Sequence, residues 1–182
     1  IYSVRRTDNQ PYQEGDFTYL PPAGLNGAEP YRRVYSKNTN ASEDNWSDLI
    51  ALTQSLAKGR FTTLLAPPTW DADYVSAVRA KVDVEQWMTW FAAQSLIGNG
   101  ETNLGNGYGD DFYFYIGVND PRARLIPYDL DTILGDGDTP ASATADLFPM
   151  IRHGSGNIDA LTPTPIYPFL RHPTFGPIYF AK

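Results

Sequence analysis

Residues 125–135 read Leu-Ile-Pro-Tyr-Asp-Leu-Asp-Thr-Ile-Leu-Gly, and this stretch combines two acidic side chains with an apolar frame. The frame consists of Leu125, Ile126, Leu130, Ile133 and Leu134. In an extended chain, Asp129 and Asp131 point to the same face, because side chains alternate along a strand. Two like charges about 4 Å apart repel by roughly 1 kcal/mol in bulk water and by about 4 kcal/mol at the dielectric of a protein surface. A divalent cation offsets this repulsion, and Asp oxygens suit Mg²⁺, Mn²⁺ and Ca²⁺. We therefore predict a metal site at these two residues.

Length and composition favour one folded domain. The chain has 182 residues, 42% of them hydrophobic, which is enough to bury a core. We expect a single domain over residues 1–182, with a β-rich part at 1–41, a helical core, loop and hairpin at 42–134, and a loop-rich part at 135–182. The first residue is not Met and the chain opens in strand-like sequence. We therefore expect it to be a segment of a longer parent chain with other domains.

The charge and the residue usage exclude several classes of partner and site. A net charge of −7 argues against a nucleic-acid or anionic-membrane partner, because neither attracts a negative surface. No apolar run approaches the roughly 18 residues that a membrane span needs. The absence of Cys excludes disulfides and thiolate metal sites. The 15 Gly, 15 Pro and 14% aromatic residues are typical of secreted bacterial modules, so we expect an extracellular or cell-surface protein.

Hydrophobic periodicity predicts three helices. Apolar residues recur at helical spacing from Trp46 to Leu56, which indicates a helix over 46–58, and a short helix is expected over 72–80. The strongest helix begins after Asp83, with Gln86 three residues later as in a capping box. Its broad apolar face predicts a central, buried position. The face comprises Trp87, Trp90, Phe91, Leu96 and Ile97.

Strand signals predict a hairpin and several extended pieces. The run 111–118 is rich in aromatics, 119–122 has turn chemistry, and 123–131 returns as the second strand. Short extended segments are expected at 1–4, 16–20 and 31–35. Residues 166–182 mix Pro with aromatics and give no assignment.

A glycine-rich loop lies between the strongest helix and the hairpin. It has five glycines in residues 98–109 and matches neither a Walker loop nor a Rossmann fingerprint. Glu101 precedes Asn106 by five positions. Protein kinases place a catalytic Asp and a metal-binding Asn at this spacing, and a second metal-binding Asp follows after a β-hairpin. The order of the elements therefore fits a phosphotransfer site built by the loop and the hairpin.

Further motifs carry a resemblance to a known family. They are Tyr31-Arg32-Arg33-Val34-Tyr35, Trp46-Ser47-Asp48-Leu49-Ile50, Val82-Asp83-Val84-Glu85-Gln86-Trp87, the Asn-containing loop, the aromatic strand and Ile126-Pro127-Tyr128-Asp129-Leu130-Asp131. With them, the chain resembles the CotH-like spore-coat protein kinases and their bacterial relatives from about Asp16 through Tyr179. The last motif is the most specific, being similar to the family's Pro-(Trp/Tyr)-Asp-x-Asp signature.

The resemblance implies an α+β, atypical protein-kinase-like C-lobe in which helices pack with a metal-binding β-hairpin. It implies ATP with Mg²⁺ or Mn²⁺ as cofactors, and phosphorylation of Ser or Thr in a secreted or coat protein as the activity. Asp131 would be the metal ligand that also binds the nucleotide, with Asp129 beside it. Glu101 stands where the family usually has the catalytic Asp, and Asp111 stands where an Asn is common, while Asn106 keeps an oxygen ligand in the loop. The family's ATP-holding Lys belongs to an N-terminal part that this chain mostly lacks, and Lys37 is a poor substitute.

Two other readings stay open. A catalytically inactive, secreted binding or structural module would retain the acidic site for Ca²⁺, and the Glu at position 101 favours it. A metal-dependent phosphoester hydrolase would need a His or Lys in the site, and none lies nearby in the sequence. Other polar residues have mainly structural explanations as turn, strand-end or surface groups: Asp110, Asp136, Asp138, Arg122, Arg124, His153 and His172.

Overall fold

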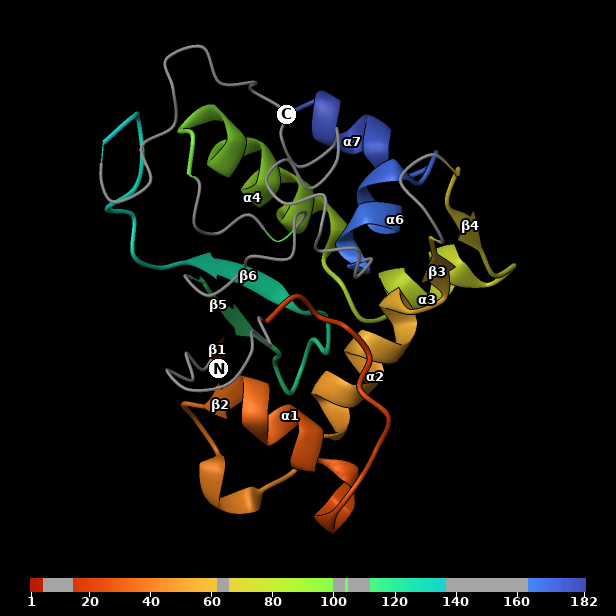
Figure 1. Ribbon diagram of the computed structural model, residues 1–182, viewed down its shortest axis with the longest axis vertical. Coiled ribbons are helices and arrows are strands. Elements are labelled where there is room, and N and C mark those ends of the chain that lie inside the picture. Colours follow the sequence, from red (N-terminus) through yellow and green to blue (C-terminus); the bar gives the residue numbers. More distant parts are fainter. Residues whose placement is uncertain (5–14, 62–65, 100–103, 105–111, 137–163) are drawn as a thin grey trace.

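The computed structural model describes residues 1–4, 15–61, 66–99, 104, 112–136 and 164–182, and each statement about the structure refers to these residues (Figure 1). Helices and one main antiparallel sheet occupy separate regions, which confirms the α+β class. In Figure 1 the long helix α4 (Val84–Leu96) lies above strand β6 (Arg124–Pro127), whereas α1 (Glu29–Val34) lies beside β2 (Tyr35–Lys37) at the bottom. The sheet therefore has α4 beside its β6 edge and α1 beside its β2 edge.

The main sheet has four strands in the order β2-β1-β5-β6, and all neighbours are antiparallel. Its remaining strands are β1 (Tyr2–Val4) and β5 (Phe112–Tyr115). A second sheet pairs β3 (Gly59–Arg60) with β4 (Thr69–Trp70). The prediction of an extended segment at 1–4 is confirmed, and this strand lies inside the main sheet.

The other two predicted extended segments are wrong. Residues 29–34 form α1, which Pro30 favours in the first turn because its missing N–H has no partner to lose there. The strand begins only at Tyr35. Residues 16–20 form no strand, since Phe17 has a φ of 61° in the left-handed region.

The predicted helices are confirmed near their expected positions, as α2 (Ser47–Leu56), α3 (Tyr74–Arg79) and α4. Short 3₁₀ turns occur at η1 (Leu25–Gly27) and η2 (Ala41–Glu43). The unassigned end of the sequence forms two short helices, α6 (Ile166–Arg171) and α7 (Gly176–Phe180). Helix α7 packs on α4, so this end belongs to the core layer.

The start of α4 uses half of the predicted capping box. The Asp83 carboxylate accepts a hydrogen bond from the backbone N–H of Gln86 at 3.4 Å, as expected of an N-cap. The Gln86 side chain, however, bonds the backbone of Leu125. Helix α4 is as buried as predicted, except that Leu96 is 62% exposed.

An aromatic cluster joins the sheet to α4. The Phe17 ring lies 5.1 Å from the rings of Trp87 and Phe114 and 5.6 Å from that of Phe112, between centroids, and all four residues are fully buried. Each such side chain buries about 150–250 Å² on folding. The cluster therefore fixes β5, and with it the hairpin, against the helix.

Candidate functional site

The predicted hairpin is confirmed. Strands β5 and β6 pair in the register Phe112↔Pro127 to Tyr115↔Arg124, although both are shorter than predicted. The chain thus enters β5 and leaves β6 at the same end of the hairpin. Pro127 closes β6, because it has no N–H to continue the ladder. Residues that follow Pro127 are delivered to this sheet end.

The extended geometry predicted for Asp129 and Asp131 is wrong. Strand β6 stops at Pro127, and Asp129 has a φ of 50° in the left-handed region. Asp tolerates this conformation better than most residues, because its short polar side chain can bond the local backbone. Alternation along a strand therefore does not apply to these residues. Their closeness follows from spacing alone, since Cα atoms two positions apart lie within roughly 7 Å.

Both carboxylates face solvent, and the apolar frame is open. Asp129 and Asp131 are exposed, and Leu130 and Leu134 are exposed beside them, so the expected desolvating enclosure is absent among the described residues. The hydroxyl of the buried Thr132 donates to the Asp131 carboxylate at 3.4 Å. Within the described residues, neither carboxylate forms an ion pair. Among the described residues, the site thus presents two acidic side chains with no cationic side chain paired to them.

Two tyrosines flank these carboxylates on the outer face of the hairpin. The rings of Tyr113 and Tyr128 lie 4.5 Å apart between centroids. Burial raises the pKa of Tyr113, and the hydrogen bond with Tyr128 and the negative charge of Asp129 add to the increase. The Asp129 carboxylate is therefore close enough to act on the Tyr113 phenol.

Three of the predicted site residues, Glu101, Asn106 and Asp111, lie outside the described residues. The same holds for Asp110, Asp138 and His153. In the described part of the chain, three or more His, Cys, Asp or Glu side chains are nowhere grouped so as to hold a metal ion. Asp129 and Asp131 thus lie two positions apart on one described segment, and their role as ligands, like that of the three residues outside the described part, stays a prediction.

The hairpin arginines are paired with acids at the turn. Arg122 and Arg124 each contact the Asp120 carboxylate, at 2.8 Å and 3.1 Å, and Arg124 also contacts Asp83 at 3.0 Å. Their guanidinium groups lower the pKa of Asp120 far below its usual range, with Arg122 contributing most. Since the turn lies at the opposite end of the hairpin from Pro127, these cations serve the fold.

Lys37 lies away from the two carboxylates. In the sheet, Lys37 of β2 pairs with Tyr2, the first residue of β1, whereas Val4 is the last residue of β1. The Lys37 ammonium group donates to the Asn45 carbonyl at 2.7 Å. Val4 is the end of β1 that lies toward Phe112. This arrangement agrees with the expectation that Lys37 is a poor substitute for an ATP-holding lysine.

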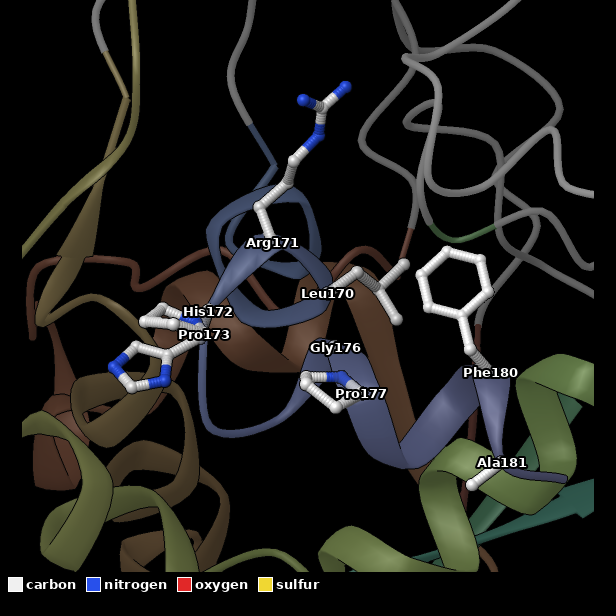
Figure 2. A pocket seen from close by; sticks show the side chains of 8 residues that line it. All are labelled: Leu170, Arg171, His172, Pro173, Gly176, Pro177, Phe180 and Ala181. Carbon is white, nitrogen blue, oxygen red and sulfur yellow. The ribbon is translucent and has the colours of Figure 1, made fainter.

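His172 belongs to an aromatic cluster and to the rim of a separate hollow. Its ring lies 4.9 Å from the rings of Trp70 and Phe175, and burial lowers its pKa. An open apolar hollow of about 550 Å³ lies between α6 and α7 (Figure 2), and all its lining residues fall between Leu170 and Ala181. The hollow is therefore distinct from the acidic hairpin end.

Sequence reasoning missed the role of Gln86. Its side-chain amide bonds both the N–H and the C=O of Leu125 in β6, at 2.9 Å and 2.8 Å. The capping-box pattern singled this residue out as a helix-start signal only. The available signal was weak, because Glu85 is also polar in the first turn and the sequence does not distinguish the two side chains.

Comparison with known protein families identifies the chain. The family model described as CotH kinase protein matches residues 21–166. The chain belongs to the CotH kinase family. Comparisons with curated proteins and with solved structures found no match.

The CotH match covers the elements that carry the candidate site. It includes α4, the glycine-rich loop and the hairpin with Asp129 and Asp131, and it ends at the first residue of α6. Strand β1 lies outside the match, although it pairs with β5. Among the described residues, no helix combines the length and the apolar character needed to cross a membrane. The family indicates a kinase-like function with a protein substrate.

Proposed function

We propose that this CotH-family chain is part of an atypical, metal-dependent Ser/Thr protein kinase that transfers the γ-phosphoryl group of ATP to a secreted or surface protein. The observation that carries the proposal is the family match over residues 21–166, which includes the loop and the hairpin. Phosphoryl transfer depends on metal ions that bridge the phosphates and on a carboxylate that positions the nucleophile. The acidic end of the hairpin can supply the first requirement.

Asp129 and Asp131 would hold the Mg²⁺ or Mn²⁺ that accompanies ATP. Mg²⁺ is commonly bound through one or two carboxylates together with substrate phosphates and waters. Two exposed carboxylates that form no ion pair with any residue in the described part of the chain fit that donor set. Asp111 and Asn106 would add oxygen ligands, and Glu101 would act as the catalytic base. Since Asp111 precedes Phe112, it is adjacent in sequence to the residue that pairs with Pro127.

The hairpin and α4 would correspond to the C-lobe of a protein kinase. In support, the order helix, loop, hairpin and acidic residues matches the kinase catalytic order. An extracellular or surface location and further domains in a parent chain are part of the same proposal. The composition supports the location, and the division into parts at 1–41, 42–134 and 135–182 stays a prediction.

A second candidate is an inactive module that uses the same carboxylates to bind Ca²⁺. The Glu at position 101 favours it, because Glu is one methylene longer than the Asp that usually serves as base. Ca²⁺ accepts a wider range of oxygen geometries than Mg²⁺, so misplaced carboxylates can still bind it. Both candidates use the same two carboxylates to bind a cation, but only the kinase also binds ATP.

Thermal unfolding with different ligands separates the two candidates. The kinase should be stabilised by ATP only when Mg²⁺ or Mn²⁺ is present, because a ligand that binds only the folded state raises its stability. The inactive module should respond to Ca²⁺ alone. Transfer of labelled γ-phosphate to a Ser-rich acceptor protein then tests catalysis directly. A chain that responds to none of these cations, with or without ATP, would contradict both candidates.

A further inference from the structure

The start of α4 and the segment before it are bonded by three hydrogen bonds to Ala123, the residue that precedes β6. The Ala123 N–H donates to the Lys81 carbonyl at 2.7 Å, and the Asp83 N–H donates to the Ala123 carbonyl at 3.1 Å. The indole N–H of Trp87 donates to the same carbonyl at 2.9 Å, and this bond is buried. The first turn of α4 and the strand are thereby held in one fixed register.

Gln86 continues this attachment one step further along β6. Leu125 pairs with Phe114 on its β5 side, and the Gln86 amide bonds its N–H and C=O at 2.9 Å and 2.8 Å. The amide thus satisfies a donor and an acceptor on the same residue, as a neighbouring strand would. Buried backbone groups of this kind need a partner, and losing it costs about 1–3 kcal/mol for each group. Leu125 is 2% exposed, so water does not readily replace the amide.

The other end of α4 holds the chain again after the two carboxylates. The Leu134 N–H donates to the carbonyl of Ile97, which caps the C-terminus of the helix, at 2.6 Å. In Figure 1 the segment leaving β6 rises beside this end of α4. Asp129 and Asp131 therefore lie between two attachment points on one helix.

The segment between these points has slack. From Gln86 to Ile97 the helix rises by roughly 16 Å, at 1.5 Å per residue. The nine steps from Leu125 to Leu134 can span about 30 Å when extended. The excess is taken up by turns, including positive φ values at Asp129 and Leu134. Because the segment is not taut, the attachments at Leu125 and Leu134 limit the range of positions that the carboxylates can take, and loss of one attachment would widen that range.

We propose that Gln86 is a positioning residue for the cation site: through Leu125 it fixes the strand that delivers Asp129 and Asp131. The inference rests on the proposed function, which assigns these carboxylates to a metal. Gln86 does not itself contact the metal or the nucleotide in this proposal. Its loss should free the segment and weaken the site without unfolding the domain.

Gln86→Met tests the proposal, because Met has a similar length and shape but makes neither hydrogen bond. Tyr31→Phe is the matched control: it removes a buried hydroxyl on α1 that forms a hydrogen bond with the Thr53 hydroxyl on α2 at 2.8 Å and touches neither attachment point of the segment. Both variants should lower the melting temperature. Measurements are made well below both melting temperatures, so that each variant is folded.

Two readouts distinguish positioning from general destabilisation. In the metal-free protein, amide hydrogen exchange over residues 126–134 should accelerate at least tenfold in Gln86→Met and remain unchanged in Tyr31→Phe. Mn²⁺ binding, followed by electron paramagnetic resonance, should weaken at least tenfold in Gln86→Met only. Equal behaviour of the two variants in both readouts would overturn the inference. If the wild-type chain binds no Mn²⁺ while exchange still accelerates in Gln86→Met, the metal site of the proposed function fails and the attachment of the segment stands.

Discussion

Replacing Asp131 with Asn should stabilise the metal-free protein. Asp129 and Asp131 lie within roughly 7 Å of each other at their Cα atoms. At that distance two unit charges repel by about 0.6 kcal/mol in water and about 2.4 kcal/mol at an effective dielectric of 20. Both side chains are exposed, and physiological salt screens charges over about 8 Å, so the low end applies. Because the unfolded chain keeps the same spacing and part of the same repulsion, we expect a gain of no more than about 0.5 kcal/mol from Asn, which keeps the size of Asp and removes one charge.

With Mg²⁺ and ATP the order of stability should reverse. A ligand at a hundredfold excess over its Kd stabilises the folded wild type by about 2.7 kcal/mol. The variant should gain little of this, because it lacks one of the two carboxylates. For a domain of this size, about 1 kcal/mol corresponds to roughly 2–4 °C in Tm. The variant should therefore melt slightly above the wild type in EDTA, by no more than about 1–2 °C, and several degrees below it in saturating Mg²⁺ and ATP.

Differential scanning calorimetry under both conditions measures this crossing. Glu43→Gln is the control: Glu43 is an exposed carboxylate on η2, next to the opposite edge of the sheet from β6, and its loss should alter neither comparison. A metal-free Asp131→Asn protein that melts below the wild type would refute the reasoning, since the carboxylate would then have a structural role. A full nucleotide response in the variant would remove Asp131 from the metal site.

Three further changes test separate parts of the structure. Phe17→Ala should lower the free energy of unfolding in urea by about 3–5 kcal/mol. Phe17→Gly should lower it by no more than this, because Gly relieves about 1–2 kcal/mol of left-handed backbone strain and adds an entropic penalty of only about 0.5–1 kcal/mol. A Gly variant that is clearly less stable than the Ala variant would contradict this. Burial lowers the pKa of His172 below its ordinary 6.5, so the unfolded chain takes up the proton first and stability should fall as the pH drops below about 6.5. His172→Phe should flatten that part of the pH profile, and an unchanged profile would assign the effect to other groups. If Glu101 is the catalytic base, Glu101→Asp should raise the rate of phosphoryl transfer by up to about a hundredfold, because Asp has the side-chain length usual for this base in the family. A slower variant would show that the site of this chain requires the longer Glu side chain.

Local signals sufficed for the elements whose patterns are unambiguous. The cap at Asp83 and the apolar face from Trp87 onward predicted α4, and the aromatic alternation of Phe112 and Phe114 predicted β5. In each case the pattern reports the buried face directly, since the side chains that recur are those that enter the core. The hairpin followed because its turn has Asn, Asp and Pro between two such runs.

Where tertiary packing decides the backbone, the sequence misled. Residues 31–35 are rich in Tyr and Val and suggested a strand, yet Pro30 and Glu29 start a helix that continues to Val34. Phe17 adopts a left-handed backbone because its ring fills the centre of the aromatic cluster, a position that neighbouring residues do not encode. A local helix-start signal was thus overlooked before residue 31, whereas at Phe17 packing overrode local propensity.

The candidate site combines both kinds of information. The spacing of Asp129 and Asp131 makes them neighbours in any backbone conformation, so their mutual repulsion was predictable although the strand geometry was wrong. Their location was not predictable, because it depends on Gln86 bonding Leu125 across 39 positions of sequence. An amide at that helix position has the same local preference whether it caps the helix or bonds a strand. Only the closed fold, in which α4 holds β6, makes the second choice favourable, and in our proposal the same choice limits where a cation would bind.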